Sequence, residues 1–138
     1  MLNMKSLMMA VALVFVGHSA MAGTELDKAI ENGGKVLDAN GIANLIVGKV
    51  VTAKSGEKTF RFYYDPSNIL HGELTNGGWQ GSGAFAITDN GQVCVSMAAD
   101  KGRYRCMTVV RTGDAVQKFS VDGKMTFELL DIEPSTGL

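Results

Sequence analysis

Cys94 and Cys106 are the residues of this 138-residue chain whose type and spacing most directly predict chemistry. They are its only two cysteines, and they bound the segment CVSMAADKGRYRC. If Gln92–Met97 and Tyr104–Arg111 are the strands of a hairpin centred on Asp100, Cys94 lies directly opposite Cys106. Opposed residues on antiparallel strands bring their Cβ atoms within about 4.5–5.5 Å, close to the separation that a disulfide needs. We therefore predict a structural disulfide.

A redox pair and a zinc site are the alternative interpretations of these cysteines. Redox-active cysteines usually occur as Cys-x-x-Cys at the start of a helix, where the thiolate is stabilised. These two are much further apart and lie on predicted strands. A zinc site needs further cysteines or histidines at ligand spacing, and His71 alone does not supply them. The sequence therefore predicts no metal site and no cofactor.

His71 and Glu73, in the segment ILHGEL, have the residue types of a general base and an orienting carboxylate. Residues two apart on a strand project from the same face, so the two side chains are neighbours. We favour a solvent-facing pair without catalytic function. The sequence contains no Gly-x-Ser-x-Gly turn, no phosphate-binding glycine-rich loop and no His-Glu-x-x-His motif. We therefore predict no catalytic residues and a protein that is not an enzyme.

Aromatic residues form the candidate binding site. In KTFRFYY, strand alternation places Phe60, Phe62 and Tyr64 on one face. The only tryptophan, Trp79, lies in the glycine-rich segment GGWQGSG, which predicts a loop that closes over a ligand at a barrel mouth. The alternative is that Trp79 plugs one end of the barrel. With Phe85, these residues predict a site for a small apolar or amphipathic ligand.

The basic residues Lys101, Arg103 and Arg105 surround the tip of the cysteine hairpin. Such a group is ordinarily a solvated turn, but it defines an alternative function. The protein would then be an interaction or inhibitor module of the cell envelope, binding an acidic protein partner through the Lys101–Arg105 tip. Tyr63 and Tyr104 are further candidates for a binding rim.

Residues 1–22 have the pattern of a secretory signal peptide. Lys5 is followed by the apolar run Leu7–Val16 and by Ala20-Met21-Ala22, so cleavage is expected before Gly23. A membrane anchor is the alternative, but a bilayer span needs about 20 apolar residues. We therefore expect export to the periplasm or beyond, no membrane insertion after cleavage, and a single domain over residues 23–138.

The charge of residues 23–138 argues against nucleic acid as a partner. Without Lys5, 12 of the 13 basic residues remain, against 14 acidic residues. Both signs are interspersed along the chain, and no basic patch stands out.

The remaining pattern predicts two short helices followed by a sheet. A cap at Thr24 and a glycine stop predict a helix to about Asn32, and a second helix is expected from Asp38 towards Val47. Turn residues then separate eight predicted strands: Val50–Lys54, Lys58–Tyr64, Ile69–Leu74, Ser82–Thr88, Gln92–Met97, Tyr104–Arg111, Ala115–Val121 and Lys124–Asp131. Their short links require antiparallel neighbours. We predict a mainly β fold, an up-and-down barrel or half-barrel of about eight strands, with a β-sandwich as the alternative.

The order of these motifs resembles a family of small exported bacterial proteins of unknown function. The resemblance covers about residues 45–130 and rests on turns, glycines and the two cysteines. Its residues are Gly83-Ala84-Phe85-Ala86-Ile87, Asp89-Asn90-Gly91, Cys94, Arg105-Cys106, Gly113-Asp114 and Asp122-Gly123. This chain has Phe85 where that family usually has tryptophan. The resemblance implies a lipocalin-like or half-barrel β fold and a periplasmic location, and it implies no chemistry.

Overall fold

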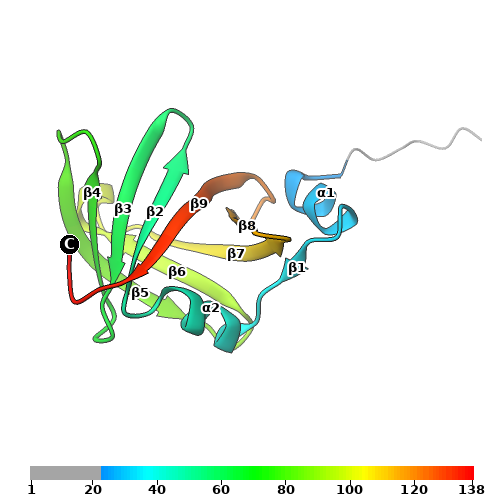
Figure 1. The fold of residues 1–138 in the computed structure, drawn as a ribbon, viewed down its shortest axis with the longest axis horizontal. Coiled ribbons are helices and arrows are strands. Elements are labelled where there is room, and N and C mark those ends of the chain that lie inside the picture. The colour runs from blue at the N-terminus through cyan, green and yellow to red at the C-terminus, as the bar shows by residue number, and fades with distance from the viewer. Residues whose placement is uncertain (1–22) are drawn as a thin grey trace, which may run out of the picture.

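The computed structural model describes residues 23–138, in which antiparallel strands close into a barrel (Figure 1). The predicted signal peptide, residues 1–22, lies outside the described residues. The barrel strands are β2 (Lys49–Ser55), β3 (Lys58–Tyr64), β4 (Ile69–Leu74), β5 (Gln80–Ile87), β6 (Gln92–Met97), β7 (Tyr104–Thr112), β8 (Ala115–Phe119) and β9 (Met125–Pro134). Each pairs with the next along the chain, and β9 pairs with β2 to close the barrel. The predicted up-and-down barrel is thus confirmed in its closed form.

Helix α1 (Glu25–Glu31) begins at a reciprocal cap. The Asp27 backbone N–H donates to the Thr24 hydroxyl over 3.1 Å, and the Thr24 N–H donates to the Asp27 carboxylate over 3.0 Å. This arrangement satisfies two backbone donors that the first turn of a helix leaves unpaired. The Leu26 N–H donates to the carbonyl of Gly123, so α1 is held against the turn between β8 and β9.

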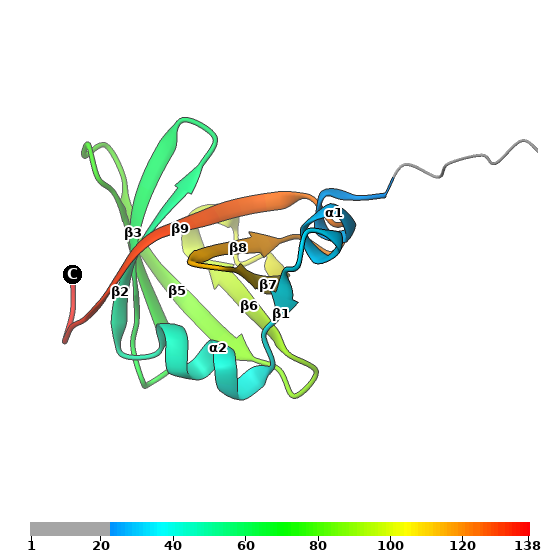
Figure 2. The ribbon, with the colours of Figure 1, turned by 45° about the vertical axis from the view of Figure 1, so that its right-hand side comes forward.

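Helix α2 (Ala39–Ile46) closes one end of the barrel, as Figure 2 shows. The Asp38 carboxylate caps it by accepting from the Gly41 N–H over 2.7 Å. Ile42 and Ile46, one turn apart, are fully buried on its inner face. Burial of each such side chain stabilises the fold by about 1.5–3 kcal/mol, which fixes α2 against β2, β5 and β6.

Two features of the chain before β2 and after β6 were not predicted. A two-residue strand, β1 (Lys35–Val36), pairs with Val110 and Arg111 of β7. These residues follow Thr108, which pairs with the first residue of β6. A single turn of 3-10 helix, Ala98–Asp100, forms the tip between β6 and β7. None of the helices within residues 23–138 has the length and apolar character required to cross a membrane.

The two ends of the barrel differ in whether a helix covers them. In an up-and-down barrel alternate hairpins share an end, so the β2–β3, β4–β5, β6–β7 and β8–β9 tips lie together. Two contacts place α2 at the other end. The Gly48 N–H donates to the Tyr64 carbonyl over 2.7 Å, and Gly91, in the β5–β6 turn, packs against the backbone of Leu37 and Asp38. At the end formed by the four tips, α1 contacts the β8–β9 turn at the edge, and no α-helix of residues 23–138 lies across the end, which we call the open end.

The β6–β7 hairpin has the predicted register. Cys94 pairs with Cys106, Val93 with Met107 and Val95 with Arg105, and the two cysteines form a disulfide. Because neighbouring residues point to opposite faces, Val95, Arg105 and Met107 face the barrel interior. The disulfide between Cys94 and Cys106 confirms the prediction.

The predicted strand Ala115–Val121 is wrong at its end. β8 stops at Phe119, and Val121 is 81% exposed in the following turn. Alternation along β8 turns Val116 and Lys118 inward, where they pair with Leu129 and Phe127 of β9. An irregularity in β9 beside Lys118 and Phe119 shifts the register there.

Candidate binding site

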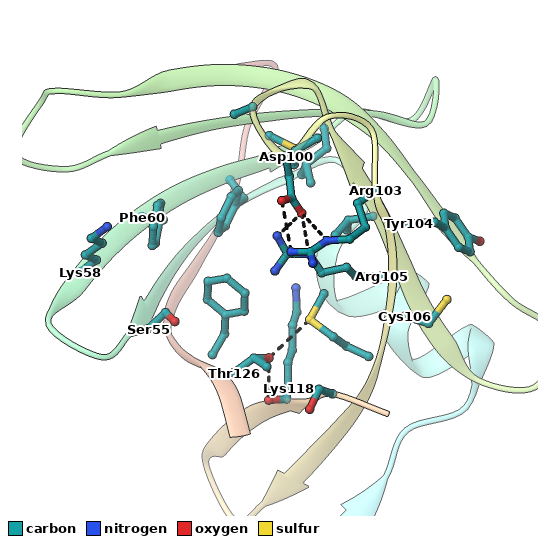
Figure 3. Close-up of a pocket in the computed structure, with 18 of the residues that line it drawn as sticks. Ser55, Lys58, Phe60, Asp100, Arg103, Tyr104, Arg105, Cys106, Lys118 and Thr126 are labelled. Carbon is teal, nitrogen blue, oxygen red and sulfur yellow. Dashed lines mark hydrogen bonds and ion pairs between the residues drawn. The ribbon is translucent and has the colours of Figure 1, made fainter. Parts of the chain in front are cut away.

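A cavity of about 710 Å³ occupies the open end of the barrel (Figure 3). Its walls include residues from the hairpin tips, such as Ser55, Asp100 and Val121, and deeper residues such as Tyr64 and Leu70. Tyr64 and Leu70 are fully buried, so the cavity runs from the tips to the hydrophobic core above α2. Sites for small ligands typically enclose about 300–1,000 Å³, and this cavity lies within that range.

Aromatic side chains form one wall of the cavity. The Phe60 and Phe62 rings stack with centroids 5.5 Å apart, and Phe127 meets Phe62 edge-on at 5.7 Å. Trp79 meets Phe60 edge-on at 6.0 Å. The structure thus brings together four of the five residues predicted for ligand binding, because Tyr64 lines the same cavity. β9 adds Phe127 to this set.

Trp79 lies against the inner wall of the barrel because two glycines leave room for its ring. Gly72 of β4 and Gly81 of β5 are directly paired. A Cβ atom at Gly81 would be 2.9 Å from Trp79 Cζ2, and one at Gly72 would be 3.0 Å from Trp79 Cη2 and from the Phe62 ring. The indole is half-buried and covers this glycine pair, so it forms part of the wall.

Phe85 is the member of the predicted set that does not line the cavity. It is buried in the core, and its ring meets Tyr64 edge-on with the centroids 5.1 Å apart. Phe85 therefore packs against the Tyr64 ring from within the core.

Lys118 is a site residue that the sequence analysis missed. Its side chain is only 3% exposed, and its ammonium group donates a hydrogen bond to the Tyr64 hydroxyl. The Nζ atom lies 4.8 Å from the Tyr64 ring centroid and 6.0 Å from that of Phe127. Figure 3 shows the side chain extending from β8 into the cavity. The available signal was alternation, which puts Lys118 on the same face as the apolar Val116.

The β6–β7 tip carries a carboxylate clamped between two arginines (Figure 3). Asp100 accepts hydrogen bonds from Arg105 Nε at 2.8 Å and from Arg103 Nη2 at 3.2 Å. The bond from Arg105, with a smaller contribution from Arg103, lowers the pKa of Asp100 below its ordinary value of 3.8. Two of the three basic residues predicted as a partner surface are therefore paired within the tip, and Lys101 is exposed beside them.

His71 and Glu73 face away from the cavity and do not form an acid–base pair. The His71 ring stacks on Tyr63 with centroids 6.2 Å apart, and Tyr63 therefore lies on the outer face, away from the predicted rim. The Glu73 carboxylate accepts a hydrogen bond from Arg61 over 3.1 Å. His71 thus contacts Tyr63, and Glu73 contacts Arg61, the residues that they face on β3.

Residues 23–138 contain no group of three or more histidine, cysteine, aspartate or glutamate side chains placed to hold a metal ion. No family model, curated protein or solved structure matches this chain. The candidate function consequently rests on the geometry of the cavity.

Proposed function

We propose that this protein binds a small apolar or amphipathic molecule in the cavity at the open end of its barrel and catalyses no reaction. The observation that carries this proposal is the cavity of about 710 Å³, which reaches from the hairpin tips to the buried core. Its aromatic wall, formed by Phe60, Phe62, Trp79 and Phe127, offers the apolar surface that ligand sites present.

An exported location is part of the proposal. The disulfide between Cys94 and Cys106 supports it, because disulfides persist in oxidising compartments such as the bacterial periplasm and are rare in the cytosol. The signal-peptide pattern of residues 1–22 supports the same location. A cavity that opens at one end of the barrel is suited to carrying a poorly soluble molecule across an aqueous compartment, or to sequestering it there.

The first test is native mass spectrometry of the protein purified from the periplasm. We expect a mass excess of small-molecule size that disappears on denaturation. A bare protein that also fails to bind the uncharged dye N-phenylnaphthylamine would overturn the proposal. A bare protein that co-purifies with a larger species would instead favour the alternative, a protein partner at the Lys101–Arg105 tip.

A matched pair of variants tests whether the dye binds inside the barrel. Val95 lines the cavity, so Val95→Trp fills part of it and should weaken dye binding by about tenfold, or about 1.4 kcal/mol. Val36 lies outside the barrel on β1 and is half-exposed, so Val36→Trp should leave dye affinity unchanged. Fluorescence titration measures both. Equal affinities for wild type and Val95→Trp would place the dye elsewhere and contradict the proposal.

A further inference from the structure

We propose that the ligand is a long-chain monocarboxylic acid whose carboxylate binds the ammonium group of Lys118 at the inner end of the cavity. This inference rests on the proposed function, which requires only that the cavity take an apolar or amphipathic molecule. It adds the chemical class of the ligand and the direction in which the ligand lies.

The position of Lys118 is the first argument. The inner end of the cavity consists of lining residues that are less than a tenth exposed, namely Phe62, Tyr64, Leu70, Met107 and Lys118. The other four contribute rings, a thioether and an aliphatic chain. Lys118 is the one charged side chain buried within residues 23–138. A polar ligand group that reaches this depth therefore meets a cation.

The bonding of the ammonium group is the second argument. An ammonium group has three N–H donors, and within residues 23–138 that of Lys118 donates a hydrogen bond to one group, the Tyr64 hydroxyl. The ion pairs within residues 23–138 join Arg61 to Glu73 and two arginines to Asp100, and none includes Lys118. Buried lysines are ordinarily paired with an acid because desolvation of a lone charge is costly. A carboxylate from the ligand supplies that partner.

The balance of charge along the cavity is the third argument. Four cationic side chains line it, Lys58, Arg103, Arg105 and Lys118, against one carboxylate, Asp100. The whole chain, by contrast, has a formal net charge of −1. Cationic side chains are thus in excess at this site, and that excess favours an anionic ligand.

The same set of charges identifies Lys118 as the headgroup site. Arg103 and Arg105 already share Asp100, and both are more than half exposed. Lys58 is exposed on the β2–β3 hairpin. A charge-assisted hydrogen bond is stronger where water is excluded, which holds for Lys118 alone among these cations. With the headgroup there, the alkyl chain runs outward along Phe60 and Trp79 to the mouth.

Dodecanoate and dodecanol test the inference, because they share a chain and differ in charge. Displacement of N-phenylnaphthylamine gives the affinity of each for wild type, Lys118→Met and the control Lys54→Met. We expect wild type to prefer the acid by about tenfold or more, and Lys118→Met to lose that preference. Lys54→Met removes the same charge from an exposed position on the outer face of β2, away from the cavity lining, and should keep the preference.

A second measurement needs no substitution and covers a Lys118→Met variant that fails to fold. With lysine-selective isotope labelling of wild type, the Lys118 Cε resonance should shift on addition of dodecanoate and stay in place with dodecanol. The inference is overturned if wild type binds both ligands equally, if Lys118→Met retains the preference, or if the resonance is indifferent to dodecanoate. Dye binding without acid preference leaves the proposed function standing, whereas binding of neither dye nor lipid overturns both.

Discussion

Asp100 shows how single contacts set the charge at the cavity mouth. Its carboxylate is bonded by Arg105 and by Arg103, and its pKa is lowered because these bonds favour the ionised form. An acid whose pKa is lower in the folded than in the unfolded protein stabilises the fold at pH values above its unfolded pKa. That contribution is lost as the pH falls through the folded pKa. The ionised form of Asp100, which the two arginines stabilise, is therefore present at neutral pH and is lost only in acid.

Arg105→Met should raise the pKa of Asp100 towards its ordinary value of 3.8, because the largest stabilising bond is removed. NMR titration of the carboxyl resonance measures the change. Asp122 is the internal control, since its lowered pKa depends mainly on a hydrogen bond from the Ser120 hydroxyl. An Asp100 pKa that is equal in wild type and Arg105→Met would contradict the account of the clamp.

At the residue scale, the sequence predicts which residues lie opposite each other in a hairpin, but it predicts poorly where individual side chains point. The position of Cys94 opposite Cys106 follows from the centre of one hairpin, and the structure has that register. The place of Trp79 depends on a gap left by glycines of two different strands, which no local pattern contains. Lys118 was missed because lysine on a strand is ordinarily assigned to solvent, whereas here Tyr64 accepts from it inside the barrel.

At the element scale, turn chemistry accounts for most of what was predictable. Three strands, β3, β4 and β6, have the predicted bounds, because Gly, Asn, Asp and Pro residues mark the turns between them. Both helices were expected from caps and glycine stops. The role of α2 was not, because closure of a barrel end depends on where Ile42 and Ile46 meet strands distant in sequence.

The disulfide should be the main covalent support of the β6–β7 hairpin. It closes a loop with a sequence separation of 12, for which loop entropy gives a stabilisation of about 3 kcal/mol. Replacing both Cys94 and Cys106 with alanine should therefore lower the melting temperature by about 10 °C. Circular dichroism measures the transition.

The matched control for the disulfide is reduction of the wild-type protein. Wild type unfolded and refolded in reductant should melt near the temperature of the double alanine variant, whose own melting curve reductant leaves unchanged. If reduced wild type melts as the oxidised protein does, the disulfide contributes no stability and the prediction is wrong.

At the scale of the whole molecule, the barrel depends on one contact between distant parts of the chain. Seven of its strand pairs join neighbours in sequence, whereas β2 pairs with β9 across most of the domain. Local turn signals therefore predict the hairpins but leave barrel, half-barrel and sandwich open. The β2–β9 pairing also creates the closed wall around the cavity, so the candidate site exists only once the barrel is shut.

Truncation of β9 should consequently open the barrel. A chain that ends at Leu130 loses four of the six β2–β9 pairs, including that of the fully buried Val51 with Ile132. It exposes unpaired strand edges and removes apolar burial, so its melting temperature should fall by at least about 10 °C, with loss of dye binding. A chain that ends at Ser135 keeps all six pairs and should behave as wild type. Similar melting curves and dye affinities for the two truncated proteins would mean that closure through β9 holds neither the fold nor the cavity together.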